Sequence, residues 1–211
     1  MRGKFITFEG PEGGGKSTHV KELAQTLRAE GVDVLVTREP GGTRLAELIR
    51  GLVREEVDDP PVTRSEVLLF LAARAQVVAN VIKPALARGT WVLCDRFADS
   101  TFAYQGYGRG IDVKLLRDLN DFATEGLTPD LTIVLDVPPE TSRARLAARQ
   151  AATATAADRI EQAGESFHRR LRDGFLELAR REPERFAVVN SDDECAKVSR
   201  LILEAVERVR A

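Results

Sequence analysis

Cysteine is scarce in this chain of 211 residues, which holds only two. Cys94 and Cys195 lie far apart and neither belongs to a CxxC pair. This count excludes a framework of disulfide bonds, which small secreted domains use to replace a core. Cys94 follows the apolar run 91–93, so we expect a buried structural thiol there. Cys195 is expected at the start of the last helix.

The chain also lacks an excess of either charge and any long apolar run. Its 31 basic and 33 acidic residues give a net charge of −2, so no global basic field favours nucleic acid or an anionic membrane as a partner. No apolar run approaches the roughly 20 residues that cross a bilayer. The charged start reaches Glu9 before the apolar region of a signal peptide develops. We therefore expect a soluble, cytoplasmic protein.

Strand-like apolar runs alternate with helical patterns along the whole chain, and neither a repeat nor a linker interrupts them. Strands separated by helices predict right-handed crossovers and a parallel sheet. The expectation is an α/β fold in one domain, residues 1–211, with a five-stranded parallel sheet covered by helices on both faces. The predicted strands are 5–8, 32–37, 90–94, 131–135 and 186–189. The predicted helices include 16–30, one ending near 56, 65–88 with a kink at Pro84, and 193–210.

A phosphate-binding loop follows the first predicted strand and opens the first predicted helix. The segment GPEGGGKS at 10–17 matches GxxxxGK[ST] in full, in the strand–loop–helix context that supports the motif. Its backbone N–H groups and the helix N-terminus favour phosphate. The motif predicts a P-loop NTPase fold that binds ATP or GTP, with Lys16 on the β- and γ-phosphates and Ser17 on Mg²⁺. The loop residues are Gly10, Pro11, Glu12, Gly13, Gly14, Gly15, Lys16, Ser17 and Thr18.

A second anion site is indicated where the third predicted strand ends in Asp95 and Arg96. An acidic residue at the carboxyl end of a strand beside the loop can hold Mg²⁺ through its water shell. The planar fork of Arg96 suits a phosphate. A carboxylate at Glu12 would repel a triphosphate, so we expect Glu12 to face a second ligand; an exposed turn residue is the alternative.

An acceptor pocket is indicated by two further segments. Residues 100–110 combine hydrogen-bonding side chains, an aromatic ring and flexible backbone, as a sugar and base pocket requires. Phe70 and Arg74 are spaced i, i+4 on one helix face, where a ring and a guanidinium could stack a base and bind its edge. The pattern alone favours a core position for Phe70 and a solvated charge for Arg74.

A lid is predicted at about 143–161, where arginines bracket the small-residue segment QAATATAA at 150–157. Such a segment could close over polyphosphate and neutralise charge in the transition state. A solvated basic helix face, with the small residues simply continuing the helix, is the alternative. A loop at 190–193 is a plausible site for the purine of the donor by position only.

These motifs together resemble a bacterial thymidylate kinase over nearly the full length. The loop identifies a superfamily only, whereas TREPGGT at 37–43, the helix with Phe70 and Arg74, and DRF at 95–97 with YQG at 104–106 narrow the resemblance to this family. Further matching segments are 8–18, 68–76, 82–86, 100–101, 129–131 and DRIE at 158–161.

The resemblance implies transfer of the ATP γ-phosphoryl group to dTMP, with Mg²⁺, in a homodimer. It places Phe70 on thymine and Arg74 at its carbonyl edge, with Thr101 and Gln105 lining the pocket. It also implies that Arg96 and Arg38 hold the acceptor phosphate, that Glu12 faces the 3′-hydroxyl, and that Tyr104 excludes ribonucleotides. The loop carries no arginine, so the catalytic arginine is expected from the lid. Arg149 is the first candidate, followed by Arg159 and Arg145.

Two other functions stay open. One is a kinase for another nucleoside monophosphate, which Phe70, Arg74 and Tyr104 disfavour. The other is a GTPase switch or regulatory ATP-binding module without an acceptor, which the missing NKxD segment and the acceptor pocket disfavour. The homodimer could use the long helix near 77–85, although an amphipathic helix packs equally well inside one subunit.

Overall fold

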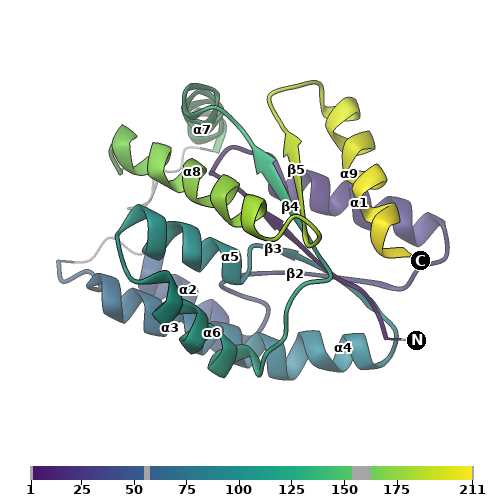
Figure 1. The fold of residues 1–211 in the computed structure, drawn as a ribbon, viewed down its shortest axis with the longest axis horizontal. Coiled ribbons are helices and arrows are strands. Elements are labelled where there is room, and N and C mark those ends of the chain that lie inside the picture. The colour runs from purple at the N-terminus through teal and green to yellow at the C-terminus, as the bar shows by residue number, and fades with distance from the viewer. Residues whose placement is uncertain (1, 55–57, 154–162, 211) are drawn as a thin grey trace.

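The protein folds around a five-stranded parallel sheet with the order β2-β3-β1-β4-β5, as a computed structural model shows (Figure 1). The structure describes residues 2–54, 58–153 and 163–210. The strands are β1 Phe5–Glu9, β2 Val34–Arg38, β3 Trp91–Asp95, β4 Leu131–Asp136 and β5 Phe186–Asn190. All five predicted strands are therefore confirmed, with ends that move by at most two residues.

The helices occupy the crossovers between these strands, as the alternation of patterns predicts. Their bounds are α1 Lys16–Ala29, α2 Arg44–Arg54, α3 Thr63–Val77, η1 Val78–Ile82, α4 Lys83–Ala87, α5 Ala98–Thr101, η2 Phe102–Gly108, α6 Val113–Thr124, α7 Pro139–Thr153, α8 Glu165–Arg181 and α9 Cys195–Arg210. The two η segments are π-helical turns.

Both faces of the sheet are buried, as the fully apolar central strands require. Side chains alternate across a strand, so Phe5 of β1 joins the cluster beneath α3, η1 and α8, while Ile6 joins the cluster under α1 and α9. Figure 1 shows α1 and α9 together at the same side of the sheet. The carboxyl ends of β1 and β3 lie side by side, with Phe8 in register with Asp95. This pairing brings the phosphate loop and the Asp95–Arg96 turn together.

The structure bears on three local predictions and corrects two of them. The helix predicted over 65–88 with a kink at Pro84 spans Thr63–Ala87 and contains the π turn η1 shortly before Pro84, where the proline ring disfavours an ordinary helical turn. The stretch 100–108 is helical rather than flexible. Residues 151–153 continue α7, which agrees with the alternative that the small-residue segment extends the helix. The rest of the predicted mobile loop lies outside the described residues.

One helical stretch, Thr63–Ala87, is long and apolar enough to cross a membrane by length and composition. That is weak support for a membrane span, because core helices pass the same test. Here Val67, Val77 and Ile82 from this stretch are buried in the cluster that contains Phe5, between the sheet and α3, η1 and α8. Its apolar character is therefore accounted for by the core.

Candidate active site

The phosphate-binding loop is shaped by glycines that no other residue could replace without strain. Gly10 has a φ of 125°, and a Cβ there would lie 2.4 Å from the carbonyl oxygen of Leu135. Helix α7 holds the loop from outside, since the Ser142 hydroxyl donates to the Glu12 carbonyl oxygen at 2.6 Å. The loop ends at Gly15, which is the N-cap of α1. The amino end of α1 therefore faces the space above the sheet, where an anion is favoured.

A cavity of about 710 Å³ opens at this end of the sheet. That volume lies within the usual range for small-molecule sites, about 300–1,000 Å³. The cavity brings together residues from the loop, the end of β3, helix α3 and helix α7. Predicted site residues that line it are Glu12, Gly13, Gly15, Lys16, Ser17, Thr18, Arg38, Phe70, Arg74, Asp95, Arg96, Thr101, Tyr104, Gln105, Arg145 and Arg149.

Lys16 lies at the end of the cavity formed by the phosphate loop, and its ammonium group donates to the carbonyl oxygens of Gly10 at 3.1 Å and Pro11 at 2.7 Å. Burial, assisted by repulsion from Arg96, lowers the pKa of Lys16 to about 8. Attraction by Glu12 and Asp95 opposes that change. The hydroxyl of Ser17 donates to the Asp95 carboxylate at 2.5 Å. The two side chains predicted to hold a metal ion are thus in contact.

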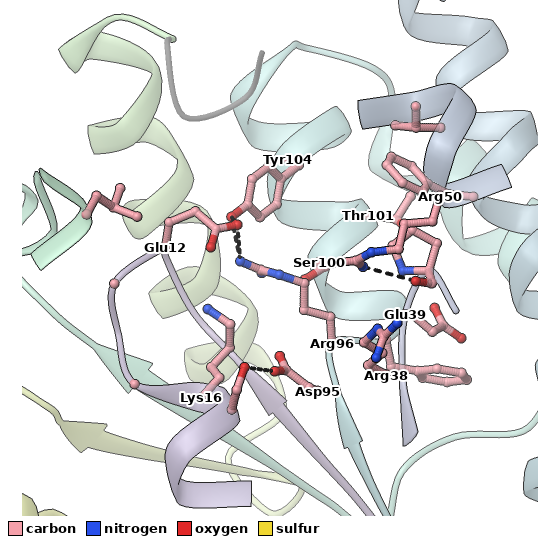
Figure 2. Close-up of a pocket in the computed structure, with 18 of the residues that line it drawn as sticks. Glu12, Lys16, Arg38, Glu39, Arg50, Asp95, Arg96, Ser100, Thr101 and Tyr104 are labelled. Atoms are coloured by element: carbon pink, nitrogen blue, oxygen red, sulfur yellow. Dashed lines mark hydrogen bonds and ion pairs between the residues drawn. The ribbon is translucent and has the colours of Figure 1, made fainter. Parts of the chain in front are cut away.

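Arg96 lies near the centre of the cavity, between the phosphate loop with Lys16 and the wall formed by Thr101 and Glu39 (Figure 2). Its guanidinium donates to the Glu12 carboxylate at 2.6 Å, to the Tyr104 hydroxyl at 3.0 Å and to the Ser100 hydroxyl at 3.0 Å. Burial raises the pKa of Glu12, but Arg96 and Lys16 outweigh it and leave the value lowered, at about 2. Glu12 is therefore ionised and directed toward Arg96 and Tyr104, away from an exposed turn.

Arg74 is buried at the cavity wall, with only 2% of its surface exposed, so the interpretation as a solvated charge is wrong. It donates to the Glu39 carboxylate, with Nε at 2.8 Å, and to Thr101 and Asn120 at 3.1 Å each. A second guanidinium nitrogen, NH2, lies 2.7 Å from the same Glu39 oxygen. The hydrogen bonds use the Nε–H group and NH1, whereas NH2 forms the ion pair with Glu39.

Gln105 is also buried, and its amide nitrogen donates to Glu66 at 2.7 Å. Its carbonyl oxygen has no partner among the described residues. A buried acceptor without a donor is costly, so this oxygen indicates where a ligand N–H could bind. Phe70 is half-buried against the α2–α3 cluster and also lines the cavity. Phe70 can therefore both pack in the core and contact a ligand in the cavity.

The four remaining predicted arginines differ in their surroundings. Arg38 lines the cavity but forms an ion pair with Glu47, its NH2 group 2.9 Å from the carboxylate. Arg145 donates to the carbonyl oxygens of Gly13 at 3.3 Å and Ser191 at 2.9 Å, so it supports the loop. Arg149 lines the cavity and contributes to lowering the pKa of Glu12. Arg159 lies outside the described residues.

The sequence does not identify several residues of the site, because their roles depend on contacts between segments that are far apart in the chain. Glu39 lies inside the TREPGGT segment, but that motif does not indicate that Glu39 binds Arg74. Glu9 accepts from the Phe97 amide at 2.7 Å and from the Ser100 hydroxyl at 2.6 Å, and so fixes the turn that carries Arg96. Burial, with repulsion from Asp99, raises the pKa of Glu9 to about 7. Asn120 comes from α6, an element to which no site residue was assigned.

Comparison with known proteins decides the family. The family model described as thymidylate kinase matches residues 8–202. The chain belongs to the thymidylate kinase family. It is 48% identical over 214 residues to the thymidylate kinase of Pseudomonas putida (strain GB-1), with all of both chains covered. It is 46% identical over 209 residues to that of Pelotomaculum thermopropionicum, covering 99% of this chain and 95% of the relative.

The fold of the thymidylate kinase family is also found in the structural comparison. The crystal structure of thymidylate kinase from Ehrlichia chaffeensis matches with a TM-score of 0.77 and 35% identity, covering 98% of this chain and 99% of that one. The matched family region begins at Phe8, before the phosphate loop, and reaches into α9. It therefore contains the described residues that line the cavity. The P-loop NTPase fold and the kinase family predicted from the sequence are both confirmed.

Proposed function

We propose that this chain transfers the γ-phosphoryl group of ATP to dTMP in the 710 Å³ cavity, giving ADP and dTDP. Membership of the thymidylate kinase family supports the reaction. The observation that carries the assignment to this cavity is its two-ended geometry. The phosphate loop with Lys16 lies at one end, and Glu39 and Thr101 lie at the other, with Arg96 between them (Figure 2). Glu39 and Thr101 both bind the buried Arg74. Phosphoryl transfer needs positioning and charge neutralisation rather than a protein nucleophile.

The donor triphosphate occupies the loop and the amino end of α1. Lys16 exchanges its two backbone acceptors for phosphate oxygens, which are stronger acceptors for an ammonium group. The hydroxyl of Ser17 and the carboxylate of Asp95 are hard oxygen donors at the same point, as Mg²⁺ requires, and they would hold it. When bound, Mg²⁺ neutralises charge on the transferring phosphates.

The acceptor base occupies the pocket at Arg74. Thymine offers carbonyl oxygens on either side of an N3–H group. The NH2 group of Arg74 can donate to a carbonyl oxygen, and the oxygen of Gln105, which has no partner among the described residues, can accept from N3–H. Cytosine has no N3–H in its neutral form, so it would leave Gln105 unsatisfied. Phe70 provides a ring at the same wall.

The acceptor phosphate binds at Arg96, with Arg38 as a second cation at the cavity wall. Glu12 then gives up its bond to Arg96 and faces the 3′-hydroxyl of the sugar. Tyr104 is held by Arg96 and packs at the edge of Phe167 and Phe175, with ring centroids 6.2 Å apart in each case. A ring fixed in this way can crowd the 2′ position and disfavour a ribonucleotide.

The lid at about 143–161 supplies Arg149 to the transition state, within a single domain of residues 1–211. Arg149 stands one turn beyond Arg145 on α7, and its charge acts on Glu12 at the cavity mouth. Arg159 stays a second candidate. Closure of such a lid would exclude water, which otherwise competes with dTMP for the phosphoryl group.

The enzyme acts in the cytoplasm as a homodimer. The apolar residues near 77–85 are mostly buried in the chain's own core, which favours packing of that helix inside one subunit over a dimer interface. The exposed side chains of Leu45, Leu48 and Leu52 on α2 and Leu68 on α3 give a better interface, because they are 46–61% exposed on two helices that pack together. Sedimentation of Leu48→Glu beside the parent chain tests this surface: the variant should sediment as a monomer.

The substrate assignment is tested by coupled ADP release with dTMP, dUMP, dCMP, UMP and dGMP at equal concentrations. We expect dTMP to be the best acceptor and UMP, with its 2′-hydroxyl, to be poor. Replacing Gln105 by Leu should reduce kcat/KM for dTMP by roughly 5- to 100-fold, the cost of an unpaired buried N–H. Equal rates with all five acceptors would contradict the assignment.

A further inference from the structure

A group of metal-ligating side chains lies outside the cavity, between α1 and α9. His19 and Glu22 come from α1, and Cys195 is the first residue of α9. One ligand atom from each lies within 4.8 Å of the others. Helices α1 and α9 pack against each other beside the sheet (Figure 1). The group therefore joins the helix that begins at the phosphate loop to the last helix of the chain.

The spacing of these atoms is close to that of a tetrahedral metal site. His19 Nδ1 lies 3.2 Å from the Glu22 carboxylate, and the Cys195 sulfur lies 3.7 Å from it. With the usual bond lengths to zinc, tetrahedral N, O and S ligands lie about 3.3–3.6 Å apart. A cation would need only small side-chain rotations, and Cys195 is free to make one because it is exposed.

Ser199 of α9 adds a further donor atom to this group. Together with His19 and Glu22 it also lines a neighbouring cavity of about 20 Å³, to which Cys195 does not contribute. The Ser199 hydroxyl lies 3.0 Å from His19 Nδ1 and 2.7 Å from the Glu22 carboxylate, at the position of a fourth donor.

We propose that His19, Glu22 and Cys195 form a site for a zinc-like divalent cation, with Ser199 or water as the fourth ligand. The mixed N, O and S donor set selects Zn²⁺ or Co²⁺ over Mg²⁺, which prefers oxygen alone. Binding forms bonds from the cation to His19, Glu22 and Cys195 and to the fourth ligand, displaces water from the hydrated cation, and releases the thiol proton of Cys195 to solvent. The imidazole binds through Nδ1 and keeps its proton on Nε2, the atom that lies toward Gly15 of the phosphate loop.

Titration of the full chain with Co²⁺, with the thiols kept reduced by a phosphine, tests the site. We expect one Co²⁺ per chain with a thiolate-to-cobalt charge-transfer absorption and tetrahedral d–d bands, all removed by Zn²⁺. Co²⁺ at the nucleotide site would lack the thiolate absorption. Cys94 cannot supply it, because this thiol is fully buried and burial raises its pKa well above the ordinary value.

Variants identify the ligands. Cys195→Ser should abolish the charge-transfer absorption, and Glu22→Gln should weaken Zn²⁺ binding by at least about tenfold, since even outer-shell losses cost 10- to 100-fold. Glu194→Gln, a neighbouring exposed carboxylate, should change neither measurement. Kinase activity without added zinc should be the same in Cys195→Ser and the parent chain. Absence of the charge-transfer absorption in the parent chain, or its survival in Cys195→Ser, would overturn the proposal.

Discussion

The guanidinium of Arg96 donates to the carboxylate of Glu12 across 2.6 Å, and this bond ties the end of β3 to the phosphate-binding loop. The bond gives Arg96 a temporary anionic partner at the place where the acceptor phosphate is expected. A buried cation is costly without an anion nearby, so Glu12 stabilises the site before substrate arrives. The phosphate can then replace Glu12 without a large rearrangement of Arg96.

Loss of the Arg96 charge should therefore affect the acceptor more than the donor. We expect Arg96→Met to lower kcat/KM for dTMP by about 10²- to 10³-fold, the usual cost of removing a preorganised donor from a developing charge. The KM for ATP should change much less. Steady-state kinetics with each substrate varied in turn makes the comparison. Arg172→Met is the matched control, because Arg172 pairs with Asp136 and does not line the cavity; equal effects of the two variants would contradict the role of Arg96.

The pKa of Lys16 predicts a pH dependence for the binding of ATP. In the free protein this pKa is lowered to about 8, so above pH 8 the side chain is mostly neutral. The triphosphate binds the charged form, and complex formation must then take up a proton. We expect kcat/KM for ATP to be level below this pKa and to fall by about tenfold for each further pH unit above it. Calorimetry of ATP binding above pH 8, in two buffers of different ionisation enthalpy, should show proton uptake. If no proton is taken up and kcat/KM for ATP does not change with pH, the proposed titration of Lys16 is excluded.

Arg149 should act on the chemical step rather than on binding. We expect Arg149→Ala to lower kcat by about 10³-fold or more, as loss of a transition-state arginine does in related phosphoryl transfers. The Kd for dTMP, measured by titration, should stay nearly constant. Arg143→Ala is the control on the same helix, since Arg143 is half exposed and pairs with Glu165. An unchanged kcat in Arg149→Ala would remove this residue from the mechanism and leave Arg159 as the candidate.

The stability of the sheet edge depends on a buried ion pair between Arg185 and Asp99. Arg185 donates to both carboxylate oxygens, at 2.7 and 3.0 Å, and Asp99 is 1% exposed. Arg185→Met should lower the free energy of unfolding by about 3–5 kcal/mol, because it leaves a buried charge unpaired. Urea denaturation measures this value. Arg180→Met removes an exposed pair with Glu177 and should change the free energy of unfolding much less; similar losses in both variants would contradict the account.

The sequence predicts the parts of the site that depend on local pattern. The phosphate loop follows from glycines, lysine and serine at fixed spacing, and the parallel sheet follows from the alternation of strands and helices. The sheet then explains why Asp95 meets Ser17, because the ends of neighbouring parallel strands share one edge. Arg74 is a residue whose surroundings the sequence does not predict. Its partners Glu39, Thr101 and Asn120 come from three other segments, and no spacing along the chain indicates that they meet.

The most direct measurement follows radioactive phosphorus from the γ position of ATP in the purified enzyme, with and without dTMP. The account predicts that the label appears in the β-phosphate of dTDP, at a rate that depends on dTMP and is strongly reduced in Arg96→Met. Label released only as inorganic phosphate, at the same rate whether or not dTMP is present, would contradict it.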